Sequence, residues 1–218
     1  MQVDYIHISI ILDRTGSMER IRDDTIGGFN AFLEEQQQLP GHATLTLVQF
    51  DTQDPYEVIH HFKPIQDIPK LSRETYVPRA STPLLDAIGR GINDLEHSIA
   101  KLDAHERPGK VVLVIITDGK ENSSQEFKKD QIVKMIKQHQ RQHNWQFVFL
   151  SADLNAIDDA QAYGFHRGSS LRYARSAHGV SSAWSSFSDT VTGHRQSKDE
   201  QIQFTDADRQ QQEEESKK

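Results

Sequence analysis

The stretch IHISIILDRTGSM, from Ile6 to Met18, decides the fold of this chain. Its first half is an apolar run rich in β-branched residues, which is typical of a strand buried on both faces. The run ends abruptly at Asp13, and an amphipathic helical pattern begins just after Ser17. A strand, a tight turn and a helix in this order predict the first unit of a parallel α/β sheet.

The turn carries oxygen-bearing side chains at alternate positions. On an extended segment Asp13, Thr15 and Ser17 would project to one side, and ligands of open α/β sheets bind outside the carboxyl ends of the strands. One carboxylate and two hydroxyls suit a small hard cation such as Mg²⁺. Ser, Thr and Asp are also the residues that cap helices, so the turn alone leaves both interpretations open.

Composition excludes several classes of site and partner. The chain has 218 residues, enough for one sizeable core, and no cysteine, so it can form neither a disulfide nor a thiolate zinc site. Its formal net charge of -7 argues against nucleic acid as the main partner. No stretch approaches the roughly 20 apolar residues that cross a bilayer, and MQVDYIH does not resemble a signal peptide. We therefore expect a soluble cytoplasmic protein without membrane contact.

Periodicity predicts alternating helices and strands along the chain. Helices are expected at 18–38, 82–102, 125–142, 155–163 and 180–191, and strands at 43–50, 56–62, 110–117, 146–150 and 166–173. The short connection at 51–55, expected to be solvated, implies an antiparallel hairpin at a sheet edge. Thr82 is expected to cap its helix, with Pro83 at the first helical position. The order predicts an open α/β sheet, mostly parallel with one antiparallel edge strand and with helices on both faces.

The end of the chain differs in composition from the rest. Residues 193–218 are polar and charged, ending in QQQEEESKK. Such a composition predicts a disordered tail, because too little apolar surface is available to offset the entropy of ordering. The domain is therefore expected to span residues 1–192.

Two further motifs are expected at the same edge of the sheet as the first turn. The most apolar strand, Lys110–Thr117, ends in Asp118 and Gly119, and Thr82 stands at the start of a helix. The strands that end at Asp13 and at Thr117 are expected to lie side by side at the sheet centre. Their carboxyl ends would then deliver Asp13 and Asp118 to one crevice, which the loop with Thr82 can cover.

These spaced motifs together resemble the metal-ion-dependent adhesion site of von Willebrand factor A domains, of the small intracellular bacterial and phage type. The resemblance covers roughly residues 5–191, in motif order and in order of elements. It implies a Rossmann-like sheet with one divalent cation at its top, Mg²⁺ or Mn²⁺ ahead of Ca²⁺. It also implies the metal site residues: hydroxyls of Thr15, Ser17 and Thr82 on the ion, and Asp13 and Asp118 close by, acting partly through water and partly by orienting the hydroxyls.

Two positions depart from the pattern of that family. Thr15 stands where serine is usual, and its hydroxyl can ligate equally well. Arg79, Ala80 and Ser81 precede Thr82, where glycine is frequent, which predicts a stiffer and more basic loop.

The expected function follows from the chemistry of such a site. A cation held mainly by neutral hydroxyls and water keeps much of its charge, and an open position of its octahedral shell attracts an anionic oxygen. The resemblance implies that a partner protein supplies an Asp or Glu, which makes the chain a metal-dependent interaction module, an adaptor, and not an enzyme. The alternative is a structural subunit of a larger assembly. A metal-dependent hydrolase ranks below both, because no general base stands out, although Glu121 is near the metal motif in sequence.

Two other clusters have more than one interpretation. His139 and His143, four residues apart on a predicted helix, could share a zinc ion, but their Gln and Lys neighbours favour a solvated face. Arg167, Arg172 and Arg175 form a modest basic cluster, which is more often solvated than anion-binding.

Overall fold

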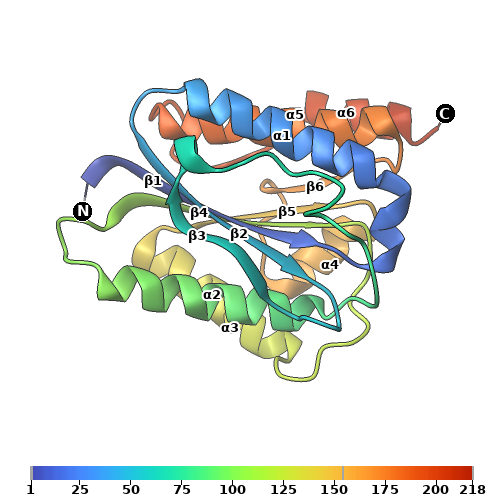
Figure 1. Ribbon diagram of the computed structural model, residues 1–218, viewed down its shortest axis with the longest axis horizontal. Coiled ribbons are helices and arrows are strands. Elements are labelled where there is room, and N and C mark those ends of the chain that lie inside the picture. Colours follow the sequence, from blue (N-terminus) through green and yellow to red (C-terminus); the bar gives the residue numbers. More distant parts are fainter. Residues whose placement is uncertain (1, 154, 218) are drawn as a thin grey trace.

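One sheet, sandwiched between helices, organises the chain in a computed structural model that describes residues 2–153 and 155–217 (Figure 1). In this part of the chain six strands pair in the order β3-β2-β1-β4-β5-β6. Their bounds are β1 (Gln2–Asp13), β2 (His42–Phe50), β3 (Glu57–Pro64), β4 (Pro108–Thr117), β5 (Gln146–Ser151) and β6 (Ser170–Arg172). All neighbouring strands are parallel except β2 and β3, which are antiparallel. The predicted fold class is therefore confirmed, including the antiparallel edge strand.

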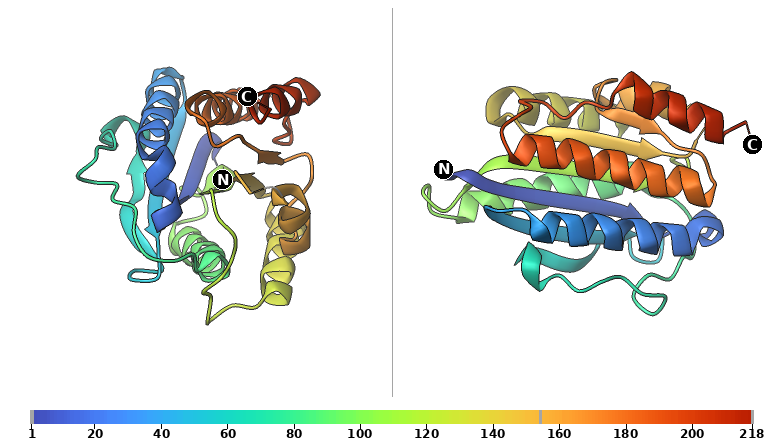
Figure 2. Two further views of the ribbon diagram at one scale, coloured as in Figure 1. Left: turned by 90° about the vertical axis from the view of Figure 1, so that its right-hand side faces the viewer. Right: turned by 90° about the horizontal axis from the view of Figure 1, so that it is seen from above.

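Helices cover both faces of the sheet (Figures 1 and 2). One face carries α1 (Arg22–Gln38), which follows the 3-10 turn η1 (Gly16–Ile21), together with α5 (Ala177–Arg195) and α6 (Asp206–Glu215). The other face carries α2 (Leu84–Lys101), α3 (Lys129–His143) and α4 (Ala156–Tyr163), and a short 3-10 turn η2 (Ile65–Asp67) follows β3. Successive side chains of β1 point to opposite faces of the sheet. Ile10 and Leu12 therefore lie in the core under α1 and α5, and Ile11 lies in the core under α2.

The first turn and the Asp118 motif meet because their strands are neighbours. Strand β1 pairs with β4 from Ile6–Lys110 to Leu12–Ile116, so both strands end at the same level of the sheet. On the other side Asp13 pairs with Phe50 at the end of β2. Three chain segments therefore leave the carboxyl edge of the sheet next to one another.

Two helix starts differ from the sequence prediction. Helix α3 begins at Lys129 and not at Gln125, because the buried Asp86 carboxylate accepts hydrogen bonds from the backbone N–H groups of Gln125, Glu126 and Phe127 at 2.8–2.9 Å and holds them in a loop. Helix α2 begins at Leu84, with Pro83 in the cap position and not at the first helical position. Thr82 does not cap this helix, which frees its side chain for another role.

The prediction of a disordered tail is wrong for the residues that the structure describes. Helix α5 continues to Arg195, and Ile202 and Phe204 are buried in the core on the α1 side. Thr205 then caps α6 through a reciprocal pair of hydrogen bonds with Asp208. The guanidinium of Arg209 on α6 donates to the carbonyls of β6 and its preceding turn, at Ser170 (2.8 Å), Arg167 (3.0 Å) and Gly168 (3.1 Å). The polar composition reflects a helix that covers the free edge of the sheet with few apolar anchors.

The described helices include none that is both long and apolar enough to cross a membrane.

Candidate metal site

The predicted metal residues gather around the backbone of Gly119. A Cβ atom placed on Gly119 would lie 3.3 Å from Thr82 Oγ1, 3.6 Å from Ser17 Oγ and 4.0 Å from Asp13 Oδ2. Oxygens from the β1 turn and from the loop before α2 therefore converge where the chain leaves β4. Glycine at this position leaves the space between them open.

Hydrogen bonds connect the remaining predicted residues to this group. Ser17 Oγ donates to Asp118 Oδ1 at 2.5 Å, and Ser17 Oγ and Thr15 Oγ1 are 3.2 Å apart. The Asp13 carboxylate accepts from the Thr15 backbone N–H at 2.7 Å and from the Thr117 hydroxyl at 2.5 Å. Thr117, to which the sequence analysis gave no role, thus orients Asp13; its place directly before Asp118 is the signal that could have identified it.

Most of the cluster is shielded from solvent. Asp13, Thr15, Thr82 and Asp118 are buried, and Ser17 is exposed. Burial raises the pKa of Asp13 to about 7; the hydrogen bonds from Thr117 and Thr15 oppose the rise and the nearby Asp118 charge adds to it. A cation beside this carboxylate would relieve both the desolvation and the repulsion.

Two buried tyrosines donate hydrogen bonds to the last backbone carbonyls of the central strands β1 and β4. The hydroxyl of Tyr76 donates to the Asp13 carbonyl at 2.6 Å, and that of Tyr173 donates to the Thr117 carbonyl at 3.0 Å. Tyr76 lies in a segment expected to be irregular and Tyr173 at the end of a weak strand, so their spacing in sequence gave no sign of this shared role.

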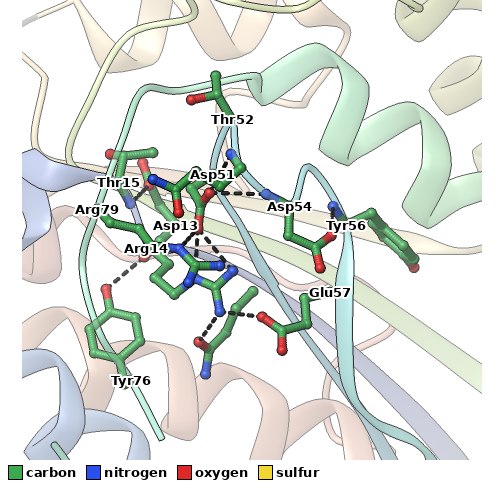
Figure 3. Close-up of polar contacts among 12 residues, drawn as sticks. Asp13, Arg14, Thr15, Asp51, Thr52, Asp54, Tyr56, Glu57, Tyr76 and Arg79 are labelled. Carbon is green, nitrogen blue, oxygen red and sulfur yellow. Dashed lines mark hydrogen bonds and ion pairs between the residues drawn. The ribbon is translucent and has the colours of Figure 1, made fainter. Parts of the chain in front are cut away.

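The fully buried carboxylate of Asp51, directly after β2, anchors the loop that carries Thr82 (Figure 3). Asp51 Oδ2 accepts from Arg14 Nε at 2.9 Å and from Arg79 Nε at 2.8 Å. Its other oxygen accepts from the backbone N–H groups of Gln53 (2.6 Å) and Asp54 (3.0 Å). Asp51 is therefore not part of a solvated hairpin loop, as the sequence had suggested. It joins the β1 turn, the β2–β3 connection and the Thr82 loop.

Backbone hydrogen bonds hold the same loop to the β1 turn. The N–H of Arg79 donates to the Arg14 carbonyl at 2.9 Å, and the N–H of Gly16 donates to the Ala80 carbonyl at 3.1 Å. Ala80 has φ 59°, in the left-handed region that favours glycine. The loop thus adopts a backbone bend that glycine favours at a position that carries a side chain.

Two charged residues near the site have roles that the sequence did not indicate. The carboxylate of Glu121 accepts hydrogen bonds from the backbone N–H of Leu85 at the start of α2 and from Ser123 and Ser124, so it caps the helix. Arg175, from the segment before α5, donates to the Asp118 carbonyl, and its Nε lies 3.7 Å from Asp118 Oδ2.

The solvated face expected on α3 is confirmed for His143, which is exposed, and is wrong for His139. His139 is buried edge-to-face against Trp145, with ring centroids 4.3 Å apart, and its ring is 5.5 Å from that of His143. Burial lowers the pKa of His139 below its ordinary value.

The donor set at the sheet edge suits a hard divalent cation. It offers hydroxyls from Thr15, Ser17 and Thr82 and carboxylates from Asp13 and Asp118, all oxygen ligands. Within the described ranges, no cluster of three or more histidine, cysteine, aspartate and glutamate side chains forms an alternative metal site.

Comparisons with known proteins give similarity at the level of structure. The sequence matches no protein-family model and no curated protein. Among solved structures, the chain is similar to a von Willebrand factor type A protein from Catenulispora acidiphila, at TM-score 0.57 and 12% identity over 87% of this chain and 43% of the other. It is also similar to the pilus adhesin SpaC from Lactobacillus rhamnosus GG, at TM-score 0.65 and 14% identity over 87% and 30% of the two chains.

A third similar structure is proximal thread matrix protein 1 from the mussel byssus, described with a zinc-occupied MIDAS motif. It aligns at TM-score 0.58 and 11% identity over 86% of this chain and 46% of that protein. This chain thus spans less than half the length of each of these structures. The sheet order, the helices on both faces and these similarities show that the chain has the fold of a von Willebrand factor A domain.

Proposed function

We propose that this chain is a metal-dependent protein-interaction module, an adaptor that acts in the cytoplasm. In this proposal a divalent cation is held by the hydroxyls of Thr15, Ser17 and Thr82, with Asp13 and Asp118 supporting it. The cation then accepts an Asp or Glu carboxylate from a partner protein.

The placement of Thr82 is the observation that carries the proposal. Its side chain is buried although it does not cap α2, and its hydroxyl lies over Gly119 beside Ser17 Oγ. Among the described residues no hydrogen bond uses the Thr82 hydroxyl, while the backbone N–H and carbonyl of Thr82 are both bonded to Asn122. The Thr82 hydroxyl oxygen is not among the fully buried atoms without a partner, so it remains accessible within the cluster, where its backbone holds it in a position to bind a ligand.

The chemistry of the donors supports binding over catalysis. Three neutral hydroxyls leave most of the charge on a cation, so an exchangeable position would attract an anionic ligand from outside. Glu121, the nearest candidate base in sequence, is occupied at the start of α2. A von Willebrand factor A fold in a pilus adhesin and in a byssus matrix protein with a zinc-occupied MIDAS motif is compatible with this role. We propose Mg²⁺ or Mn²⁺ ahead of Ca²⁺, because small hydroxyl-rich octahedral sites suit the smaller ions.

Calorimetric titration of MnCl₂ and MgCl₂ into chelator-treated protein tests the site. The wild type is expected to bind one ion. Thr82→Val keeps the shape of the side chain and removes its hydroxyl, and should weaken binding by about tenfold or more. Ser81→Ala is the matched control, because it removes the hydroxyl of the neighbouring residue, which is exposed. Equal affinities of the Thr82→Val variant and the wild type would rule out Thr82 as a ligand.

The interaction is tested separately by affinity capture. Partners retained by the wild type in Mn²⁺ should be lost in excess chelator and lost with Thr82→Val, and they should be retained by Ser81→Ala. Replacing candidate acidic residues of a captured partner one at a time with their amides should then abolish capture at a single position. A partner that binds equally well in chelator and to Thr82→Val would contradict a metal-mediated interaction.

A further inference from the structure

A small basic groove lies at the edge of the sheet, away from the candidate metal residues. It has a volume of about 230 Å³ and is bordered by β6 and its preceding turn, by the start of α4 and by α6. Three arginines line it: Arg167, Arg172 and Arg209. We call this the arginine groove. It differs from the cluster expected from sequence, because Arg209 from the tail helix joins it and Arg175 lies at Asp118 instead.

No carboxylate of the described residues forms an ion pair with the arginines of the groove, although Asp206 and Asp208 lie close enough to Arg209 to attract its charge. In the described ranges neither Arg167 nor Arg172 has an ion pair or a side-chain hydrogen bond, and Arg172 Nε is buried without a partner. Arg209 bonds to three backbone carbonyls, which satisfy its N–H groups but carry no net charge. Burial, followed by repulsion from Arg167, lowers the pKa of Arg209. The Nε atom of Arg172 is itself inaccessible, so an anion in the groove would contact the terminal N–H groups of Arg167 and Arg172, which have no acceptor among the described residues.

The charge and size of the groove identify the class of anion. Its lining includes three arginines and one carboxylate, Glu213, so the local formal charge is +3 - 1 = +2. A phosphate monoester carries about -1.5 to -2 at pH 7, whereas a single carboxylate would leave positive charge behind. Guanidinium groups bind phosphate oxygens in pairs. The volume lies below the roughly 300–1,000 Å³ typical of pockets for larger ligands.

We propose that the arginine groove is a binding site for a phosphoryl group, with Arg167 and Arg172 as the direct ligands. Arg209 holds the β6 edge in place and adds its charge. The hydroxyl of Ser216, also in the lining, donates to the Gln212 carbonyl at 2.8 Å, so the arginines are the donors for the phosphate oxygens. This site is independent of the proposed cation site, since none of its residues belongs to the cation cluster.

Phosphate titration followed by NMR tests the proposal on the metal-free full chain. The side-chain Nε–H signal of Arg172 should shift saturably with sodium phosphate at pH 7.5, and sodium chloride or acetate at equal ionic strength should not reproduce the shift. Arg172→Gln should weaken phosphate binding at least about fivefold, measured on the backbone amides of Leu171 and Gln212. Arg141→Gln, which removes an exposed arginine on α3, is the control and should bind as the wild type does.

A second titration distinguishes the source of the phosphoryl group. Tighter binding of N-acetyl-phosphoserine amide than of inorganic phosphate would support a phosphorylated protein side chain as the ligand, and equal binding would support free phosphate. A non-saturating shift that chloride reproduces, or unchanged affinity in a folded Arg172→Gln variant, would overturn the proposal. Arg172 belongs to β6, but its side chain makes no hydrogen bond or ion pair with the described residues, so this variant is expected to keep its thermal midpoint.

Discussion

Asp51→Asn is the substitution that tests most directly how the Thr82 loop is held. The carboxylate is fully buried, and its principal partner Arg14 is 6% exposed. Asparagine keeps an oxygen for the backbone N–H groups of Gln53 and Asp54, but its NH₂ group would face the Arg14 and Arg79 guanidinium groups as a second donor. The turn is therefore retained while the buried ion pair is lost.

The magnitude follows from the burial of each partner. Removing one member of a buried pair costs about 3–5 kcal/mol. Arg14 keeps contacts to Gln49 and Glu57, which reduces the loss, and the 39% exposed Arg79 adds only about 0–1 kcal/mol. We expect the free energy of unfolding to fall by about 3 kcal/mol, a large part of the roughly 5–15 kcal/mol typical of a domain.

Urea denaturation in the presence of chelator measures this change without a contribution from metal. Glu57→Gln is the matched control: it removes another carboxylate from Arg14, but one whose side chain is 41% exposed, so it should cost only about 0–1 kcal/mol. The m-value should be unchanged in both variants. If Asp51→Asn loses no more stability than Glu57→Gln, the buried network does not hold the loop in the way described above.

Three further predictions concern backbone strain, pH and the tail. Ala80→Gly should raise the free energy of unfolding by about 0.5–1 kcal/mol, measured by urea denaturation. Relief of the left-handed backbone at Ala80 is worth roughly 1–2 kcal/mol, which exceeds the cost of about 0.4–1 kcal/mol that arises because glycine adds entropy to the unfolded chain. A lower free energy of unfolding in this variant would contradict the strain at Ala80. Burial, with a smaller effect of His61, lowers the pKa of His7 to about 3. As pH falls from about 6.5 towards 3 the unfolded chain therefore binds a proton at His7 that the folded chain does not. The stability of the wild type relative to His7→Gln should fall by about 1.4 kcal/mol per pH unit over this range, so that the raised pKa of Asp13, which acts in the opposite direction in both proteins, cancels in the comparison; a stability difference that does not change with pH would contradict the shift at His7. Phe204→Ala should cost about 3–5 kcal/mol in the same urea assay, because this side chain is 5% exposed in the core; no loss would show that the tail does not pack.

The fold and most of the cluster of oxygen-bearing side chains that we propose as a metal site could be predicted from local sequence. The apolar runs ending at Asp13 and Thr117 identify two buried strands, and parallel strands end at a common edge, so contiguous motifs are delivered to one place. Thr15 and Ser17 follow Asp13 within a single turn, which made their clustering a local property. Thr82 required one long-range step, because its loop had to be placed over that edge.

The errors fall where long-range contacts override local pattern. Asp86 keeps Gln125–Phe127 out of α3 through three hydrogen bonds that span about 40 positions. The tail reads as disordered because its helix is polar, and its two apolar anchors, Ile202 and Phe204, lie before that helix in sequence. Neither feature has a periodic signal that a single sequence window can reveal.

The sequence by itself determined the order of elements, the parallel sheet with its antiparallel edge, and the oxygen-bearing turn after β1, because all of these depend on the periodicity of neighbouring residues. Only the tertiary structure decided that Asp51 is buried between Arg14 and Arg79, that α6 covers the edge of β6, and that Arg209 joins Arg167 and Arg172. These arrangements form because the packed core removes some charged side chains, and the unpaired edge of the sheet, from solvent, and each of these groups then needs a partner within the protein. That cost arises only once distant segments have come together.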